Sequence, residues 1–128
     1  MTERDATIAL NLVSGIGPMR VHQLLNVLPS TSAILNADRA TLARVPGVGG
    51  ELAERIAATD HQHALDDELS MAERAGVHIV TRHDSRYPPS LLELRDPPLC
   101  LYLRGDPSAL ASMNHAIAVV GSRRTTRY

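Results

Sequence analysis

The sequence contains no phenylalanine, no tryptophan and no lysine, and it has one cysteine and three tyrosines in 128 residues. Any hydrophobic core must therefore be aliphatic. A single cysteine, Cys100, excludes an intramolecular disulfide, and we expect it to be a small core residue of a protein in a reducing compartment. No apolar run is long enough to cross a membrane, and the acidic N-terminus is unlike a secretory signal. We therefore expect a cytoplasmic protein without a membrane partner.

The charge is balanced overall but uneven along the chain. With 13 basic and 14 acidic residues, the net charge is -1, which gives no global field to attract a polyanion. Residues 1–90 lean acidic, whereas the segment from Leu91 onward leans basic and ends with Arg123, Arg124 and Arg127. The exclusive use of arginine is explained better by a GC-rich coding sequence than by a need for bidentate phosphate contacts.

An internal repeat in residues 1–60 predicts two helical hairpins. The stretches "LVSGIGPMRVHQLL" and "RVPGVGGELAERIA" share a Gly-apolar-Gly turn followed by a segment with helical periodicity. Each unit is interpreted as helix, tight turn, helix, with Asp38 as the N-cap of the first helix in the second unit. We expect a bundle of about four or five helices, then a longer helix over residues 60–75 that ends at Gly76.

The pattern changes after Gly76. The short β-branched stretch "VHIVT" predicts a strand, the prolines after Tyr87 predict a short helix, and "LCLYLRGD" predicts a second strand. The segment "AIAVVG" is typical of a strand buried in a parallel sheet. We therefore predict a helical domain over residues 1–76, and the start of an α/β domain over residues 77–128.

The hairpin turns are candidate phosphate-binding sites, because a Gly-apolar-Gly turn leaves the amides of the following helix facing outward. The candidate residues are Gly15, Gly17, Gly47 and Gly49. Such pairs of hairpins often bind the DNA backbone without reading its sequence. The first turn has Arg20 nearby, but Glu51 and Glu54 accompany Arg55 at the second turn and would repel phosphate. A purely structural or protein-docking role for the bundle remains the alternative.

The end of the chain offers a second candidate phosphate site. A predicted strand runs into a loop that contains Gly121, Ser122 and Arg123. This loop resembles those that bind ligands at the carboxyl ends of strands in α/β sheets. The loop lacks both the G-x-G-x-x-G of dinucleotide folds and the Lys-Ser/Thr of a nucleoside triphosphate loop. A solvated run of arginines is the competing interpretation.

Metal binding and catalysis find little support in the sequence. His61 and His63 are two residues apart on a predicted helix, so they point to different faces. No catalytic arrangement of serine, histidine and acid is evident. We predict no metal, no cofactor and no enzymatic activity.

Two long motifs resemble the DNA-processing protein A family (DprA, also called Smf). They are "YPPSLLELRDPPLCLYLRGD" and "IAVVGSRRTTRY". The resemblance implies a helical domain related to the sterile alpha motif (SAM) and helix-hairpin-helix folds, followed by a Rossmann-like domain. Because that domain is longer in the family than residues 77–128 allow, we expect the chain to be a truncated N-terminal part of a longer protein.

The resemblance also implies a function. Family members bind single-stranded DNA without sequence preference and help to load the RecA recombinase during natural transformation. By position, Ser122 and Arg123 would contact DNA phosphates and Gly121 would form the turn. The complete protein would be a homodimer, with RecA bound through the part beyond this chain.

Two other interpretations compete with this one. In the first, the helical bundle is a protein-interaction module that does not bind DNA itself, and the acidic lean of residues 1–90 favours it. In the second, the Rossmann-like part is a nucleotide-processing enzyme similar to the phosphoribohydrolases. The second is disfavoured, because no catalytic acid accompanies "VVGSRR" and the glycine-rich motif of those enzymes is missing.

Overall fold

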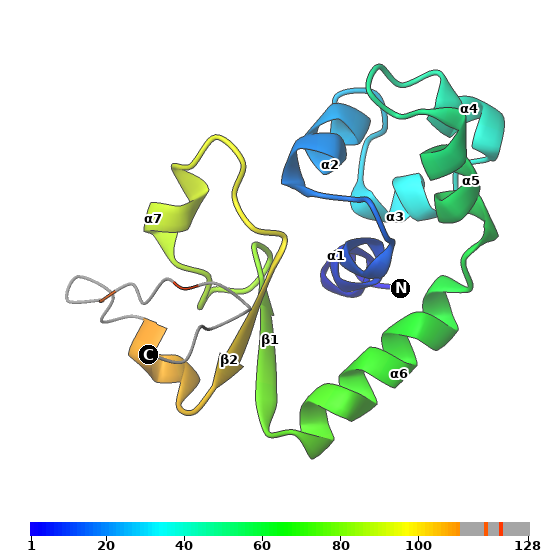
Figure 1. Ribbon diagram of the computed structural model, residues 1–128. Helices are drawn as coiled ribbons and strands as arrows, with labels where there is room; N and C mark the ends of the chain where they lie inside the picture. The colour runs from blue at the N-terminus through cyan, green and yellow to red at the C-terminus, as the bar shows by residue number, and fades with distance from the viewer. Residues whose placement is uncertain (111–116, 118–120, 122–128) are drawn as a thin grey trace, which may run out of the picture.

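The computed structural model describes residues 1–110 together with residues 117 and 121. Its elements are α1 (Glu3–Leu12), α2 (Pro18–Leu25), α3 (Thr31–Leu35), α4 (Arg39–Ala43), α5 (Gly50–Ala58), α6 (His61–Arg74), β1 (Val77–Thr81), α7 (Pro89–Leu92) and β2 (Cys100–Arg104). Helices α1 to α5 form a bundle, and α6 leads from the bundle to the two strands (Figure 1). The predicted order of two helical hairpins, a long helix and two strands is therefore confirmed.

Helix α1 is the central element. Five consecutive residues, Ala6 to Leu10, are buried, so the helix must be covered on every side along this stretch. It contacts α3 and α6 as well as both strands. Because α1 contacts both the helices and the strands, it connects the helical bundle to the sheet.

The main core is aliphatic, as the lack of phenylalanine and tryptophan predicts. All of its buried members are leucine, valine, isoleucine or alanine. When the two hairpins are aligned on Gly15 and Gly47, equivalent positions enter this core in pairs: Leu10 with Leu42, Val13 with Val45, Val21 with Ala53, and Leu24 with Ile56. The sequence repeat is thus a structural repeat in which two hairpins pack around one core.

The short helix α3 has its N-terminus capped partly from another helix. The Ser30 hydroxyl accepts a hydrogen bond from Ala33 N, and the Glu3 carboxylate on α1 accepts from Thr31 N at 2.9 Å and from Ser32 N at 3.1 Å. Hydrogen bonding with Ser32 is the main cause that lowers the pKa of Glu3 from 4.5 to about 2, against the opposing effect of burial. Glu3 therefore fixes α3 against α1.

Replacing Glu3 with glutamine is expected to lower the free energy of unfolding at neutral pH by about 0.5–1 kcal/mol, because the carboxylate acts as a partly solvated cap. The native carboxylate has a lowered pKa, so its contribution is complete above 4.5 and is lost as the pH falls through about 2. Urea unfolding of both proteins at several pH values measures this difference. Glu93→Gln, at an exposed position, is the matched control, and a Glu3→Gln difference that stayed constant down to pH 2 would refute the assignment.

The two strands form an antiparallel pair, with Val77 opposite Arg104 and Thr81 opposite Cys100. Ile79 packs with Ile8 and Leu65 in a second apolar cluster, so β1 lies directly against the helices. A helical part is thus followed by a small two-stranded sheet, while the start of an α/β domain, its extension into a Rossmann-like domain and the predicted division into residues 1–76 and 77–128 stay predictions. Of the predicted strand over residues 116–121, only Ile117 and Gly121 are described, so this strand lies outside the described residues.

The loop between β1 and β2 is fixed by a buried tyrosine. Tyr87 is 4% exposed, and its hydroxyl donates a hydrogen bond to Pro98 O at 2.7 Å. Leu99, the next residue, enters the main core of the bundle. The hydrogen bond between Tyr87 and Pro98 therefore joins the two ends of this loop, and the burial of Leu99 places the start of β2 against the bundle.

Cys100 is partly buried and packs against both apolar clusters. Burial raises the pKa of its thiol to about 12, so the reactive thiolate is scarce at neutral pH. The predicted core residue therefore packs against the core but is only partly buried. Among the described helices, none combines the length and the apolar character that a membrane crossing requires.

Candidate nucleic-acid interface

The two hairpin turns have the same backbone path. Gly15 and Gly47 have φ angles of 84° and 83°, in the left-handed region that favours glycine. One residue later, Ile16 N donates to Val13 O at 3.1 Å and Val48 N donates to Val45 O at 3.0 Å. The chain therefore reverses direction in the same way in the two units, just before α2 and α5 begin.

The helices that follow these turns begin without a capping side chain. The first helical turns of α1, α3, α4 and α6 are closed by hydrogen-bonding side chains, namely Thr2, Ser30, Asp38 and Asp60. In contrast, α2 and α5 have Gly17 and Gly49 as N-caps, and neither makes a side-chain hydrogen bond. A Cβ added at either glycine would meet no atom within 4 Å. The amides from Gly50 in α5 and from Met19 in α2, where Pro18 has no N–H, thus lack a capping side chain and can donate to an external acceptor.

Each turn packs against the second helix of the other hairpin. A Cβ added at Gly15 would lie 3.0 Å from Arg55 Nη2 on α5, and one added at Gly47 would lie 2.5 Å from Gln23 Oε1 on α2. Gln23 and Arg55 themselves occupy equivalent positions of the repeat. A cavity of about 220 Å³ lies between the turns and is lined by residues that include Gly15, Gly47 and Arg55.

Arginines and glutamates lie side by side at this surface. Arg20 Nη1 donates to Gly15 O at 2.9 Å, while Arg55 Nη1 lies 2.8 Å from Glu51 Oε1. Both arginines line the cavity between the turns, and so does Glu51. Arg20 accompanies the first turn and Glu51 lies beside Arg55, as predicted, but Glu54 pairs with Arg39 at 3.0 Å instead of lying beside Arg55. The surface therefore combines open amides, two guanidinium groups and one competing carboxylate.

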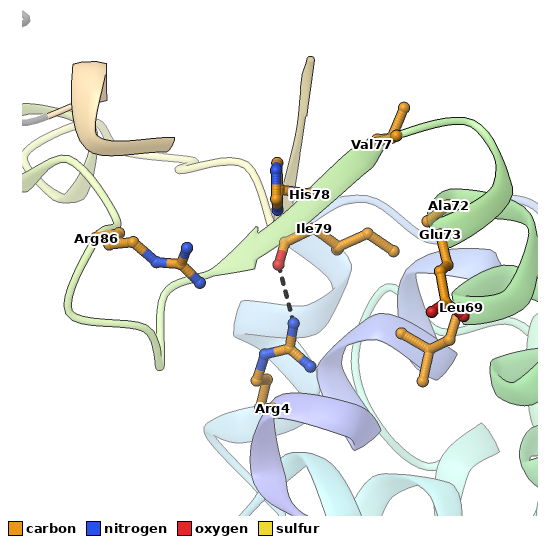
Figure 2. Close-up of a pocket in the computed structure, with 9 residues that line it drawn as sticks. Arg4, Leu69, Ala72, Glu73, Val77, His78, Ile79 and Arg86 are labelled. Atoms are coloured by element: carbon orange, nitrogen blue, oxygen red, sulfur yellow. Dashed lines mark hydrogen bonds between the residues drawn. The ribbon is translucent and has the colours of Figure 1, made fainter. Parts of the chain in front are cut away.

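A second cleft, of about 340 Å³, lies where α1, α6 and β1 meet (Figure 2). Arg4 reaches across it from α1 and donates to Ile79 O at 2.9 Å, and its Nε lies 3.3 Å from Asp84 Oδ1. Burial opposes ionisation of Asp84, but hydrogen bonds from Thr81 and the charge of Arg4 hold its pKa below the ordinary value. Arg4, one of the two arginines that line this cleft together with Arg86, is thus engaged in joining α1 to β1 and to the loop that follows it.

The other predicted site residues are placed as follows. Ser122 and Arg123 lie outside the described residues, and of that loop only Gly121 is described. The imidazoles of His61 and His63 have different partners, since His61 Nε2 lies 2.8 Å from Ile56 O and His63 Nε2 lies 3.4 Å from Asp67 Oδ2. No group of three or more potential metal ligands comes together among the residues that the structure describes.

The sequence does not predict that Gln23 and Arg55 reach across the repeat, since its pattern places Arg55 at the second hairpin alone. The sequence repeat is the signal that could have predicted these contacts. In a two-fold related pair of hairpins, the second helix of each unit lies beside the turn of the other. The equivalence is hard to recognise from the sequence, since one of the two positions holds Gln23 and the other holds Arg55.

Two protein families match this chain, one in its helical part and one from β1 onward. The family described as SAM-like Helix-hairpin-helix tandem matches residues 8–59, and the family described as DNA recombination-mediator protein A matches residues 78–128. The first match covers both hairpins, and the second begins within β1. The resemblance to the DNA-processing protein A family that the sequence motifs predicted is thereby confirmed.

Curated relatives are similar over part of the chain. UvrABC system protein C of Erwinia tasmaniensis is 42% identical over 50 residues, which are 39% of this chain and 8% of that protein. Holliday junction branch migration complex subunit RuvA is 43% identical over 56 residues in Corynebacterium glutamicum and 39% identical over 67 residues in Acidobacterium capsulatum. These matches span 41% and 50% of this chain, but only 27% and 33% of the two RuvA proteins. No solved structure matches the chain significantly.

Proposed function

We propose, from the resemblance to the DNA-processing protein A family and from the hairpin geometry, that this chain binds the DNA backbone without reading its sequence. The observation that carries the proposal is the pair of uncapped helix starts at Gly17 and Gly49, which follow two matching turns on one surface. Backbone amides at a helix N-terminus donate to phosphate oxygens, which are the same at every nucleotide. Binding of this kind positions DNA and carries no base preference.

The finer part of the proposal concerns the complete protein. We assign it the binding of single-stranded DNA and the loading of RecA, with a homodimer as the working form, in keeping with the family that residues 78–128 match. In this proposal, Gly121, Ser122 and Arg123 supply a second phosphate contact through the serine hydroxyl and the arginine side chain. The role is binding and positioning of DNA rather than chemistry on it.

The proposal is tested by fluorescence anisotropy of a labelled oligo-dT strand and of a duplex of equal length, each titrated with the chain at low and at physiological salt. Salt-sensitive binding of both DNAs is expected from the hairpin turns, with a preference for the single strand if the C-terminal loop contributes. Lack of binding to either DNA at low salt would refute the proposal and favour the protein-interaction alternative.

Arg123→Ala is expected to weaken single-strand binding and to lower the salt dependence by about one phosphate contact, because one fixed cation is removed. The measurement is the same titration repeated over a series of salt concentrations. Arg74→Ala, which removes an exposed arginine at the end of α6, is the matched control. Unchanged affinity and an unchanged salt slope for Arg123→Ala would remove Arg123 from the site.

A further inference from the structure

Two guanidinium groups from different helices meet at the first hairpin turn. Arg20 on α2 donates to Gly15 O, and Arg55 on α5 places its Nη2 next to the same glycine, 3.0 Å from where a Cβ would lie. Two cations that converge on one glycine, beside a cavity open to solvent, make an anion-binding arrangement. We infer that the tandem holds a single phosphodiester at its first turn, between Arg20 and Arg55, and none at its second turn. This inference rests on the proposed function and specifies which part of the surface does the binding.

The repeat itself shows how unequal the turns are. With Gly15 aligned to Gly47, the position equivalent to Arg20 holds Leu52, and the position equivalent to Arg55 holds Gln23. The second turn, at Gly47, therefore has a neutral amide where the first has a guanidinium, and an apolar residue where the first has an arginine. The backbone is duplicated, but the charge is not.

The charged neighbours of the two turns strengthen this difference. Arg39 comes within 4.0 Å of a Cβ added at Gly50, but its Nε is paired with Glu54 Oε2 at 3.0 Å. Glu51 lies in the first turn of α5, where its negative charge opposes an incoming phosphate. In the part of the chain that the structure describes, Arg20 belongs to no ion pair. A phosphate therefore meets two guanidinium groups beside Gly15, with Glu51, which lines the same cavity and is paired with Arg55, as the competing carboxylate.

Two carboxylates border the Arg20 and Arg55 site. Glu51 is paired with Arg55, but its side chain is 87% exposed, and a surface ion pair of this kind contributes little and is readily exchanged. Asp96, from the loop before β2, lines the adjoining cavity together with Arg20 and Gly17. Glu51 is thus a competitor that the phosphodiester displaces from Arg55, and removing its charge strengthens binding.

The experiment uses two probes with the full chain. The dinucleotide dTpdT, which carries one phosphodiester, is titrated while amide and arginine Nε signals are followed by NMR. We expect shifts at the first backbone amides of α2, those of Met19 and Arg20, and at the side chains of Arg20 and Arg55, with little change at the first amides of α5, those of residues 50–52. The absence of shifts at the first turn, or equal shifts at both turns, overturns the inference.

DNA titrations of four variants provide the second test. Arg20→Gln and Arg55→Gln are each expected to weaken binding about tenfold at low salt and to lower the salt slope by about one contact. Glu51→Gln is expected to tighten binding about threefold. Arg39→Gln, which removes a cation beside the second turn, is the matched control and is expected to change affinity by less than about twofold. Thermal unfolding of each variant confirms that it is folded.

The outcomes distinguish failure of the phosphodiester site at the first turn from failure of the proposed DNA-binding function. If the chain binds DNA but Arg39→Gln weakens binding as much as Arg20→Gln does, the one-turn inference is wrong and the proposed function stands. If no oligonucleotide binds while dTpdT still shifts the first turn, the phosphodiester site is real and the proposed DNA-binding function fails. If neither probe affects the first turn, both fail.

Discussion

Leu24→Ala is expected to lower the free energy of unfolding by about 2–5 kcal/mol. Leu24 is fully buried on α2 and belongs to the main aliphatic core, to which both hairpins contribute. The truncation removes transfer free energy and leaves a cavity that rigid neighbours on the other hairpin cannot fill. Because small domains are stable by only about 5–15 kcal/mol, this loss is a large fraction of the total.

Urea unfolding followed by far-UV circular dichroism measures the Leu24→Ala effect. Val27→Ala is the matched control, because Val27 follows the same helix and is 58% exposed. The control is expected to change the free energy of unfolding by no more than about 0.5 kcal/mol. Similar small losses for both variants would mean that the two hairpins do not share a tightly packed core.

Gly47→Ala is expected to cost about 1–3 kcal/mol, for two reasons that can be separated. The φ angle of 83° is in the left-handed region, where a residue with a Cβ is strained by about 1–2 kcal/mol. The new methyl group would also lie 2.5 Å from Gln23 Oε1, so the Gln23 side chain would have to move. The cost combines backbone strain in the turn with displacement of a contact from the other hairpin.

A double-mutant cycle with Gln23→Ala divides these contributions. Shortening Gln23 removes the clash but not the backbone strain, so the double variant should lose less stability than the sum of the single variants. Unfolding free energies of the three variants and the parent chain give the coupling directly. Strict additivity would show that the Gly47 turn does not pack against Gln23, and it would contradict the two-fold arrangement of the hairpins.

The local elements could be predicted from the sequence, because short-range patterns determine them. Helix α6 begins after Asp60 and ends before Gly76, since a capping carboxylate and a glycine with a φ of 62° mark its two ends. Strand β1 covers the predicted residues 77–81, where β-branched side chains cluster. The two turns were recognisable because left-handed backbone requires glycine at fixed positions.

The contacts that build the candidate site could not be predicted in the same way. Arg55 reaches Gly15 and Gln23 reaches Gly47 only because the two hairpins pack around one core. Glu3 caps α3 because α1 lies beside it, and no local pattern announces a cap that comes from so far back in the sequence. Tyr87 belongs to a recognisable family motif, but its hydrogen bond to Pro98 O became visible only in the fold.

The measurement that tests the central claim most directly is the salt dependence of DNA binding for two labelled oligonucleotides of equal length and different sequence. Contacts between helix amides, arginines and phosphates predict equal affinities for the two sequences and a linear fall of log K with log salt, with a slope of about -0.7 to -0.9 per phosphate. Binding that is unaffected by salt, or that prefers one sequence strongly, would contradict the account. Failure to bind either oligonucleotide at low salt would contradict it as well.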